Sequence, residues 1–373
     1  MLPTTLLTLA LILLSALPAL AGEIVILHSE SGPTPWTQKI ATGLADGLDD
    51  GTRIIQEFIG SGTLDEDHFN AEYERLADVH TDTTPEAVIA SGQTAFAFMR
   101  KYRDDLFSAA PVVFCSMPRP GPKLLNQCGD CTGIPLEMDV RDTVDLIFAV
   151  RPNTKTVVGI MDASSAGQTL RKATEAAMEP YMDRAQLIFP GHEPGDETGL
   201  DMGKLNAVAS SVPGSGAVLF LGFKEDKAGK AFNEKLAVGR LVVQSVAPIF
   251  VLTDTWLGDG VLGGMVATGE AQGQSAAGLI KRIRRGDPSQ EMLPQPTPPQ
   301  LIADATVLAR FGIRPERIPL LSKAKLINQP EHPSEQSSAT PSNVIRLTLL
   351  LVGLALLPIL FRKFGSRKRK PPE

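Results

Sequence analysis

Polar and small residues follow a series of short apolar runs, and their types are suited to holding a small solute. Small residues let backbone N–H groups at a helix N-terminus reach an anionic group, and an indole ring can stack on a planar or sugar-like ligand. Candidate ligand contacts in the first half of the chain are His28, Ser29, Trp36, Ser91, Gly92, Gln93 and Ser116. Those in the second half are Asp162, Ser164, Ser165, Gln168, Gly222, Phe223, Asp254 and Trp256.

Each candidate also has a purely structural interpretation. A Ser that precedes a helix commonly serves as its N-cap. Trp36 can be a packing residue at the edge of a lobe, and His28 can be a hydrogen-bonded turn residue. Asp162 and Asp254 are the two candidates that we favour for ligand contact.

The apolar runs alternate with helical patterns, which is typical of a parallel α/β sheet. Strands are predicted at 23–27, 53–58, 86–90, 111–115, 155–161, 186–189, 217–221 and 248–252, with a further strand between the polar turn that follows 248–252 and Gly269. Helices are predicted at 36–48, 65–79, 169–178, 202–211 and 301–311, with two more around Phe96 to Leu106 and from Gly269 to Arg285. Ligands bind outside the carboxyl ends of the strands in such sheets, which is where the candidate residues lie.

Several motifs, in the same order, resemble a known family. They are Pro35-Trp36-Thr37, Val88-Ile-Ala-Ser91, Tyr102 to Phe107, Pro111 to Cys115, Gly263 to Gly273, and Arg310-Phe311-Gly312-Ile313. The stretch from about Glu23 to about Ile318 resembles the ligand-binding domain of the ABC-transporter substrate-binding-protein-like family, which also occurs as the outer half of membrane sensors. The resemblance implies a two-lobed α/β type 1 periplasmic-binding fold, with parallel sheets flanked by helices and a hinged cleft.

Both ends of the chain carry signals for location. Leu6 to Leu20 form an apolar run of signal-peptide length before a small-residue cleavage pattern; an uncleaved anchor helix is the alternative. Val344 to Phe361 are apolar enough to span a bilayer. The six cations and one acid of 362–373 place that tail in the cytoplasm by the positive-inside rule. The body is therefore expected outside the cell membrane, on the periplasmic side, tethered by a single C-terminal pass.

Charge and composition agree with this division. The net charge of the whole chain is −6. Without the six cations and one acid of the tail and without Arg346, the remaining residues carry a net charge of −12. An acidic body of this kind argues against binding of nucleic acid. The predicted organisation is a signal peptide at 1–21, a first lobe at 22–135, a second lobe at 136–252, a return crossing with terminal helices at 253–327, a disordered stalk at 328–343, a transmembrane helix at 344–361 and a basic tail at 362–373.

Three cysteines bear on redox chemistry. In an oxidising envelope Cys128 and Cys131 are expected to close a small disulfide loop, and Cys115 at a strand end to be a buried thiol. A thioredoxin-like dithiol would lie at the start of a helix after a strand, whereas this pair is predicted to lie in a loop.

The sequence contains no complete motif for catalysis or for metal binding. The segment from Gly222 to Lys230 has the wrong spacing for a phosphate loop, and Ala231 stands where Ser or Thr would bind magnesium. The histidines show no metal-binding spacing, and we expect no metal and no cofactor.

The sequence therefore predicts a non-enzymatic, membrane-tethered solute-binding protein that captures a small molecule for an ABC importer, with the transporter permease as partner. One alternative is a ligand-sensing input module that signals through a separate partner such as a sensor kinase, because 362–373 is too short to carry a signalling domain. A second alternative is an envelope thiol oxidoreductase that uses Cys128 and Cys131. The sequence does not specify the ligand.

Overall fold

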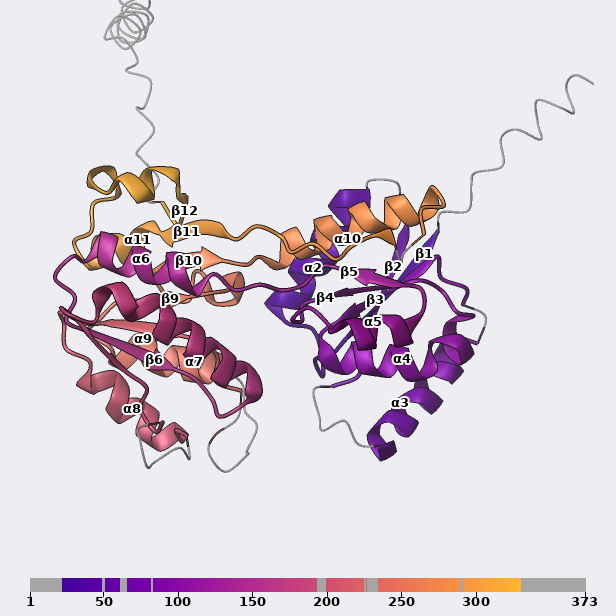
Figure 1. The fold of residues 1–373 in the computed structure, drawn as a ribbon, viewed down its shortest axis with the longest axis horizontal. Coiled ribbons are helices and arrows are strands. Elements are labelled where there is room, and N and C mark those ends of the chain that lie inside the picture. The colour runs from indigo at the N-terminus through magenta and orange to yellow at the C-terminus, as the bar shows by residue number, and fades with distance from the viewer. Residues whose placement is uncertain are drawn as a thin grey trace, which may run out of the picture. The chain divides into compact units, whose positions relative to one another are not determined.

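The computed structural model describes residues 22–48, 51–60, 66–81, 83–192, 199–224, 226, 234–288 and 291–329. Within them the chain forms two α/β lobes, each built on its own sheet (Figure 1). The predicted signal peptide, transmembrane segment and basic tail lie outside the described residues, as does the predicted stalk beyond Gln329. None of the helices in the described ranges has the length and apolar character needed to cross a bilayer.

The first lobe holds a five-stranded parallel sheet in the order β2-β1-β3-β4-β5. Its strands are β1 (Glu23–His28), β2 (Arg53–Phe58), β3 (Ala87–Ser91), β4 (Val112–Cys115) and β5 (Cys131–Gly133). Its helices are α2 (Pro35–Leu48), α3 (Glu66–Val79), α4 (Gln93–Phe107), α5 (Pro122–Cys128) and, from much later in the chain, α10 (Gly269–Arg284).

Strand β1 shows why this sheet is covered on both faces. Ile24 and Ile26 belong to the core that α2 and α10 complete, whereas Val25 and Leu27 belong to the core that α3 and α4 complete. Successive side chains of a strand point to opposite faces, so an uninterrupted apolar strand must be buried on both sides.

The second lobe holds a seven-stranded sheet in the order β12-β11-β10-β9-β8-β6-β7. Its strands are β6 (Thr156–Ile160), β7 (Gln186–Ile188), β8 (Ala217–Phe220), β9 (Ile249–Val251), β10 (Gly263–Val266), β11 (Gln300–Asp304) and β12 (Lys325–Ile327). Its helices are α6 (Val140–Val150), α7 (Ser165–Met178), α8 (Met202–Ser211), α9 (Glu234–Gln244) and α11 (Ala305–Arg310), with short 3₁₀ turns η2 (Glu179–Tyr181), η3 (Asp254–Trp256), η5 (Pro315–Arg317) and η6 (Pro319–Lys323).

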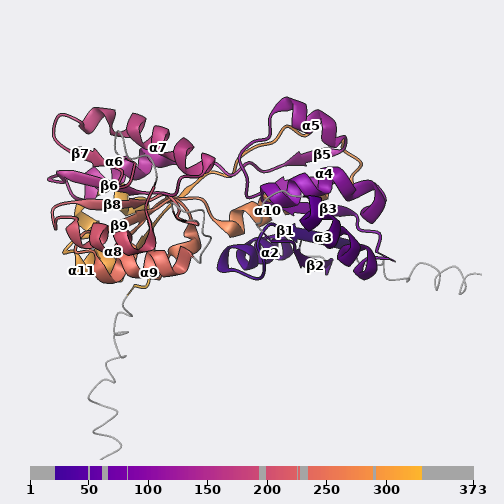
Figure 2. The same cartoon turned by 90° about the horizontal axis from the view of Figure 1, so that it is seen from below.

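The chain passes between the two lobes three times. It leaves the first lobe after β5, returns from β10 to α10, and leaves again before β11; Figure 2 shows α10 lying among the elements of the first lobe. The predicted segment 253–327 thus contributes α10 to the first lobe and three strands to the second sheet.

Two predictions about the second lobe were wrong. The stretch 301–311 is not one helix, because its first residues form β11, which pairs antiparallel with β10 and makes the second sheet mixed. Asp304 then starts α11 by accepting hydrogen bonds from the N–H groups of Thr306 and Val307. Helix α7 begins at Ser165 and not at Thr169, because Ser164 is the N-cap and accepts from the N–H of Gly167. The sequence patterns did not predict α5, β5, α6, α9 or β12.

Helices α2 and α10 pack with their backbones in close contact. A Cβ atom added at Gly43 would clash with the carbonyl oxygen of Glu270, and one added at Gly273 would clash with the carbonyl oxygen of Ile40. Ile40 and Leu44 of α2, together with Ala276 and Ile280 of α10, are fully buried at this contact. The glycines therefore allow the backbones of α2 and α10 to come closer together than any other residue at these positions would permit.

Replacing Gly273 with Ala should lower the free energy of unfolding by about 1–3 kcal/mol, because the added methyl group meets backbone atoms that cannot move independently. The control is Gly278→Ala in the same helix, where a Cβ meets nothing within 4 Å. That change should raise the free energy of unfolding by about 0.5–1 kcal/mol, because Ala is the better helix former. Urea denaturation measures both, and equal effects of the two substitutions would contradict this packing.

Candidate functional site

The carboxyl ends of β1, β3 and β4 bring most of the first-lobe candidates together. His28 is paired in register with Ser91, and Ser91 with Cys115, so the residues that follow these three strands share one edge of the sheet. This edge carries Ser29, Glu30, Gly92, Gln93 and Ser116. The predicted clustering of these positions follows directly from the parallel sheet.

Ser29 and Gly92 are occupied in building this edge. The Ser29 hydroxyl donates to the carbonyl of Ser91 at 2.9 Å and accepts from the N–H of Ala95 at 3.0 Å. Gly92 has a φ of 95°, and a Cβ there would run into the Ser29 side chain. Both residues thus shape the turn into α4, while Gln93, the first residue of that helix, is exposed.

Trp36 and Ser116 bond to one another. The indole N–H of Trp36 donates to the Ser116 hydroxyl at 2.9 Å, and the backbone N–H of Ser116 donates to Oε1 of Gln272 at 3.0 Å. Gln272 is fully buried in α10 and donates in turn to Thr297 at 3.0 Å. The packing interpretation of Trp36 therefore describes its observed contacts.

His28 is fully buried, and its ring stacks on Phe58 with centroids 4.9 Å apart. Its Nε2 lies 3.2 Å from Oε1 of Gln56, whereas its Nδ1 has no hydrogen-bond partner among the described residues. Burial lowers the pKa of His28 to about 4, against the opposing effect of the Gln56 hydrogen bond. The imidazole is therefore neutral at pH 7.

Glu30, which the sequence analysis did not select, stands out at the same edge. Its Oε2 atom is buried and has no hydrogen-bond partner among the described residues. Burial raises the pKa of its carboxyl, while its own backbone N–H and the charge of Lys224 in the second lobe act in the opposite direction. A buried carboxylate oxygen without a donor is costly, so this atom is suited to a donor from outside the chain.

In the second lobe, Asp162 connects the ends of β6 and β8. One carboxylate oxygen accepts from the N–H of Ser164 at 3.1 Å and the other from the N–H of Lys224 at 3.0 Å. Ser164 caps α7, while Ser165 is exposed and Gln168 half-buried in its first turn.

Glu234 extends this group of charges. It accepts from the backbone N–H of Phe223 at 2.6 Å, next to Gly222 with a φ of 127°. Burial is the largest influence on Glu234 and raises its pKa. The charge of Lys224 and the hydrogen bond from the Phe223 N–H lower this pKa, whereas the charge of Asp162 raises it. The Phe223 side chain is fully buried in the core, so it does not face a ligand.

Asp254 links two helices of the first lobe to the second sheet. Its carboxylate lies 3.0 Å from Nζ of Lys39 in α2 and accepts from the N–H of Gly269 in α10 at 3.3 Å. The Lys39 ammonium also donates to the Asp254 carbonyl at 2.8 Å. Trp256, two residues on, packs edge-on against Phe220 with centroids 6.3 Å apart. Asp254 is therefore engaged within the protein.

Cys128 and Cys131 are joined in a disulfide, and both are buried. The prediction that they lie in a loop was wrong, since Cys128 is the last residue of α5 and Cys131 the first of β5. A helix C-terminus carries partial negative charge, which disfavours a thiolate, and reactive dithiols are found at the opposite end. Cys115 is a buried free thiol, and burial raises its pKa to about 12.

Glu30, Asp162, Lys224 and Glu234 form what we call the charged cluster. Glu30 lies in the turn after β1 and Lys224 in the turn after β8, so their positions after strands were visible in the sequence. Glu234 starts α9, which the sequence analysis did not predict. In the described ranges no group of His, Cys, Asp and Glu side chains has the arrangement of a metal site.

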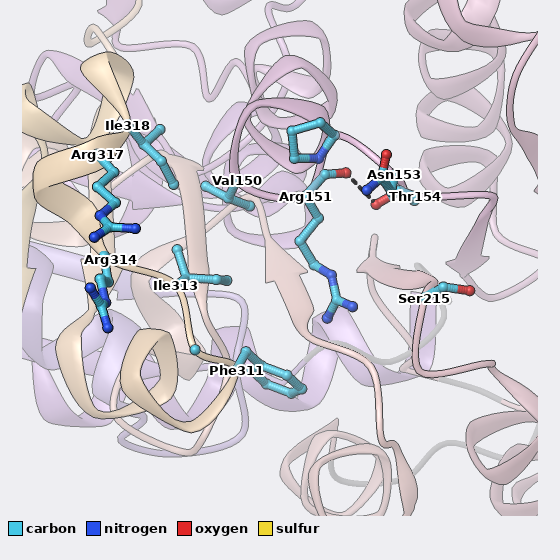
Figure 3. Close-up of a pocket in the computed structure, with 12 residues that line it drawn as sticks. Val150, Arg151, Asn153, Thr154, Ser215, Phe311, Ile313, Arg314, Arg317 and Ile318 are labelled. Carbon is cyan, nitrogen blue, oxygen red and sulfur yellow. Dashed lines mark hydrogen bonds between the residues drawn. The ribbon is translucent and has the colours of Figure 1, made fainter.

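Two sizeable cavities are lined by described residues away from the strand ends. One, of about 440 Å³, is bordered by residues 137–141, three alanines of α7 and residues 296–299. The other, of about 540 Å³, lies between the end of α6 and residues 311–318 and is drawn in Figure 3.

Comparison with known proteins gives a structural likeness at low sequence identity. No protein-family model and no curated sequence matches the chain. The ABC domain of Streptococcus pneumonia in complex with L-Trp superposes with a TM-score of 0.58 at 17% identity, covering 82% of this chain and 99% of that one. A conserved domain protein from Vibrio cholerae gives 0.56 at 15% identity, covering 82% and 99%.

A third structure is the ligand-free, open form of CD0873, a substrate-binding protein with adhesive properties from Clostridium difficile. It gives a TM-score of 0.54 at 14% identity and covers 83% of this chain and 100% of that one. All three structures are covered almost completely, and so is more than four fifths of this chain. The chain therefore has the two-lobed type 1 periplasmic-binding fold.

Proposed function

We propose that this protein is a membrane-tethered, extracytoplasmic solute-binding protein that captures a small molecule between its lobes for an ABC importer. The observation that carries the proposal is the buried Oε2 of Glu30 at the strand ends of the first lobe, which has no hydrogen-bond partner among the described residues and interacts electrostatically with Lys224 in the second lobe. Strand ends are where open α/β sheets bind ligands, and two lobes joined by crossing segments can close on a solute.

The charged cluster favours a solute with a positively charged amino group. In it the charge of one lysine, Lys224, acts on the carboxyl groups of Glu30 and Glu234, and the Lys224 backbone N–H donates to a third carboxylate, that of Asp162. Burial makes the ionised forms of Glu30 and Glu234 costly. An amino group on the solute would donate to Glu30 Oε2 and offset that cost. One protein of the same fold holds L-Trp, so amino acids are the first class to test.

The other candidates have supporting roles in this proposal. Asp162 and Ser29 hold the turns on which Lys224 and Glu30 are presented, through hydrogen bonds within each lobe. Exposed or half-buried groups, such as Gln93, Ser165 and Gln168, are free to contact the rest of the solute. The tether and the importer rest on the expectations from the sequence.

A thermal-shift screen of amino acids, amines, sugars and organic acids should find a stabilising solute that carries an amino group. A ligand at a hundred times its Kd adds about 2.7 kcal/mol to the free energy of unfolding. Glu30→Gln should abolish that shift, because the amide presents no negative charge. Glu74→Gln, an exposed glutamate of α3, should leave it unchanged. A folded protein that responds to no solute would contradict the proposed function.

Binding should weaken as the pH falls. Burial raises the pKa of the Glu30 carboxyl in the free protein, and a bound cation favours the ionised form, so protonation through that raised pKa competes with the solute. Glu234, whose pKa is also raised, adds to this effect, whereas neutral His28 gains charge only near pH 4. Calorimetry should show an affinity that declines on acidification; an affinity independent of pH would count against a cationic solute.

A further inference from the structure

The cavity of about 540 Å³ in the second lobe is lined by three arginines, although the protein is acidic overall. Arg151 comes from the end of α6, and Arg314 and Arg317 come from the segment after α11. Figure 3 shows the side chains of Arg314 and Arg317 running in the same direction on one side of the cavity. In that view Arg151 lies on the other side, and Phe311 and Ile313 lie between Arg151 and the other two arginines.

The local backbone sets the direction of Arg314 and Arg317. Helix α11 ends at Arg310, and Gly312, with a φ of 68°, turns the chain so that Ile313 is buried. The next residues form η5, in which the N–H of Arg317 donates to the carbonyl of Arg314 at 3.1 Å. A 3₁₀ turn has three residues per turn, so these two side chains lie on the same side.

Arg151 is fixed on the other side of the cavity. It caps the end of α6, and Thr154 donates to its carbonyl from both the N–H and the hydroxyl, at 3.0 and 2.8 Å. One guanidinium nitrogen donates to the carbonyl of Gly214 at 2.5 Å, and the group lies 6.0 Å from the centre of the Phe311 ring. Burial lowers the pKa of Arg151, with no carboxylate to raise it.

Among the described residues, these arginines lack the carboxylate partners that several other arginines have. Arg53, Arg75 and Arg171, for example, each have a carboxylate oxygen within 2.9 Å. Within the described ranges, Arg151, Arg314 and Arg317 form no ion pair. The neighbouring Arg184 and Arg310 form none either: Arg184 stacks on the rings of Phe148 and Tyr181, and Arg310 stacks on the ring of Phe311. Glu316 is exposed and does not line the cavity.

We propose that this cavity, referred to as the arginine cavity, binds a phosphate group. Guanidinium groups form paired hydrogen bonds with phosphate oxygens, and three of them around one space suit a group that presents two or more anionic oxygens. Either a free phosphate or the headgroup of an anionic phospholipid could supply it. The proposal is independent of the solute site, because none of the charged-cluster residues lines this cavity.

The test is calorimetric titration of the full chain at fixed ionic strength with three probes: inorganic phosphate, dihexanoyl phosphatidylglycerol below its micelle concentration, and dihexanoyl phosphatidylcholine as the zwitterionic reference. Saturable binding of phosphate identifies a free anion, and binding of the phosphatidylglycerol alone identifies a lipid headgroup. No saturable binding of either anionic probe, or equal binding of the phosphatidylcholine, would overturn the proposal.

The double substitution Arg314→Gln/Arg317→Gln should weaken that binding at least about tenfold, or about 1.4 kcal/mol. The matched control is Lys281→Gln/Arg285→Gln, which removes two exposed cations from the end of α10 and should leave binding unchanged. Arg314 and Arg317 are themselves exposed, so the folded state should survive, and a circular-dichroism melt checks this. Equal losses in the two double variants would show a general charge effect and would also overturn the proposal.

Discussion

The backbone contact between α2 and α10 is the constraint on which the rest of the described body depends. Glycines on both helices let main-chain atoms meet where side chains would otherwise stand, so only one placement of α10 on the first lobe is possible. That placement brings Gln272 to the N–H of Ser116 and Gly269 to the carboxylate of Asp254. The strand ends of the first lobe and the crossing from β10 are thereby held by the same helix.

The polar groups at the strand ends divide into two kinds once their hydrogen bonds are traced. Ser29, Asp162 and Asp254 accept from backbone N–H groups that would otherwise be unsatisfied at turns and helix starts, and Ser116 is bonded to the side chains of Trp36 and Gln272. Glu30 is of the second kind, because one of its oxygens, like Nδ1 of His28 and Oγ of Ser91, is buried and has no hydrogen-bond partner among the described residues, and it is the one acidic group among these three. Such an atom lowers stability, and a bound solute is the simplest reason for a fold to carry it.

The sequence predicted the sheets and the edge that carries the candidate residues, because both follow from local patterns. The apolar run of β1 and the spacing of Ile40, Leu44 and Leu48 in α2 are signals of this kind. Helix α9 was missed because its buried face is only three residues, Ala237, Val238 and Leu241. Strand β11 was taken for a helix because its three apolar residues fit either period, and only pairing with β10 distinguishes them.

The individual contacts could not be predicted in the same way. Asp162 accepts hydrogen bonds from the N–H groups of Ser164 and Lys224. Lys224 is 62 residues from Asp162, and no local sequence pattern connects these two residues. Whether an acidic side chain is satisfied by the chain or left for a solute depends on such distant partners. For this reason the sequence favoured Asp254 and passed over Glu30, whereas the fold places Lys39 and Gly269 beside Asp254.

The three crossings also bear on how the body is made. The first lobe begins at β1 but lacks one of its covering helices until Arg284 has been synthesised, and the second sheet is incomplete until β12 is available near Ile327. Until then Ile24, Ile26 and Ile40 have only part of their apolar cover. Neither lobe is therefore a unit whose core a growing chain can complete early, because each needs residues from the last quarter of the described body.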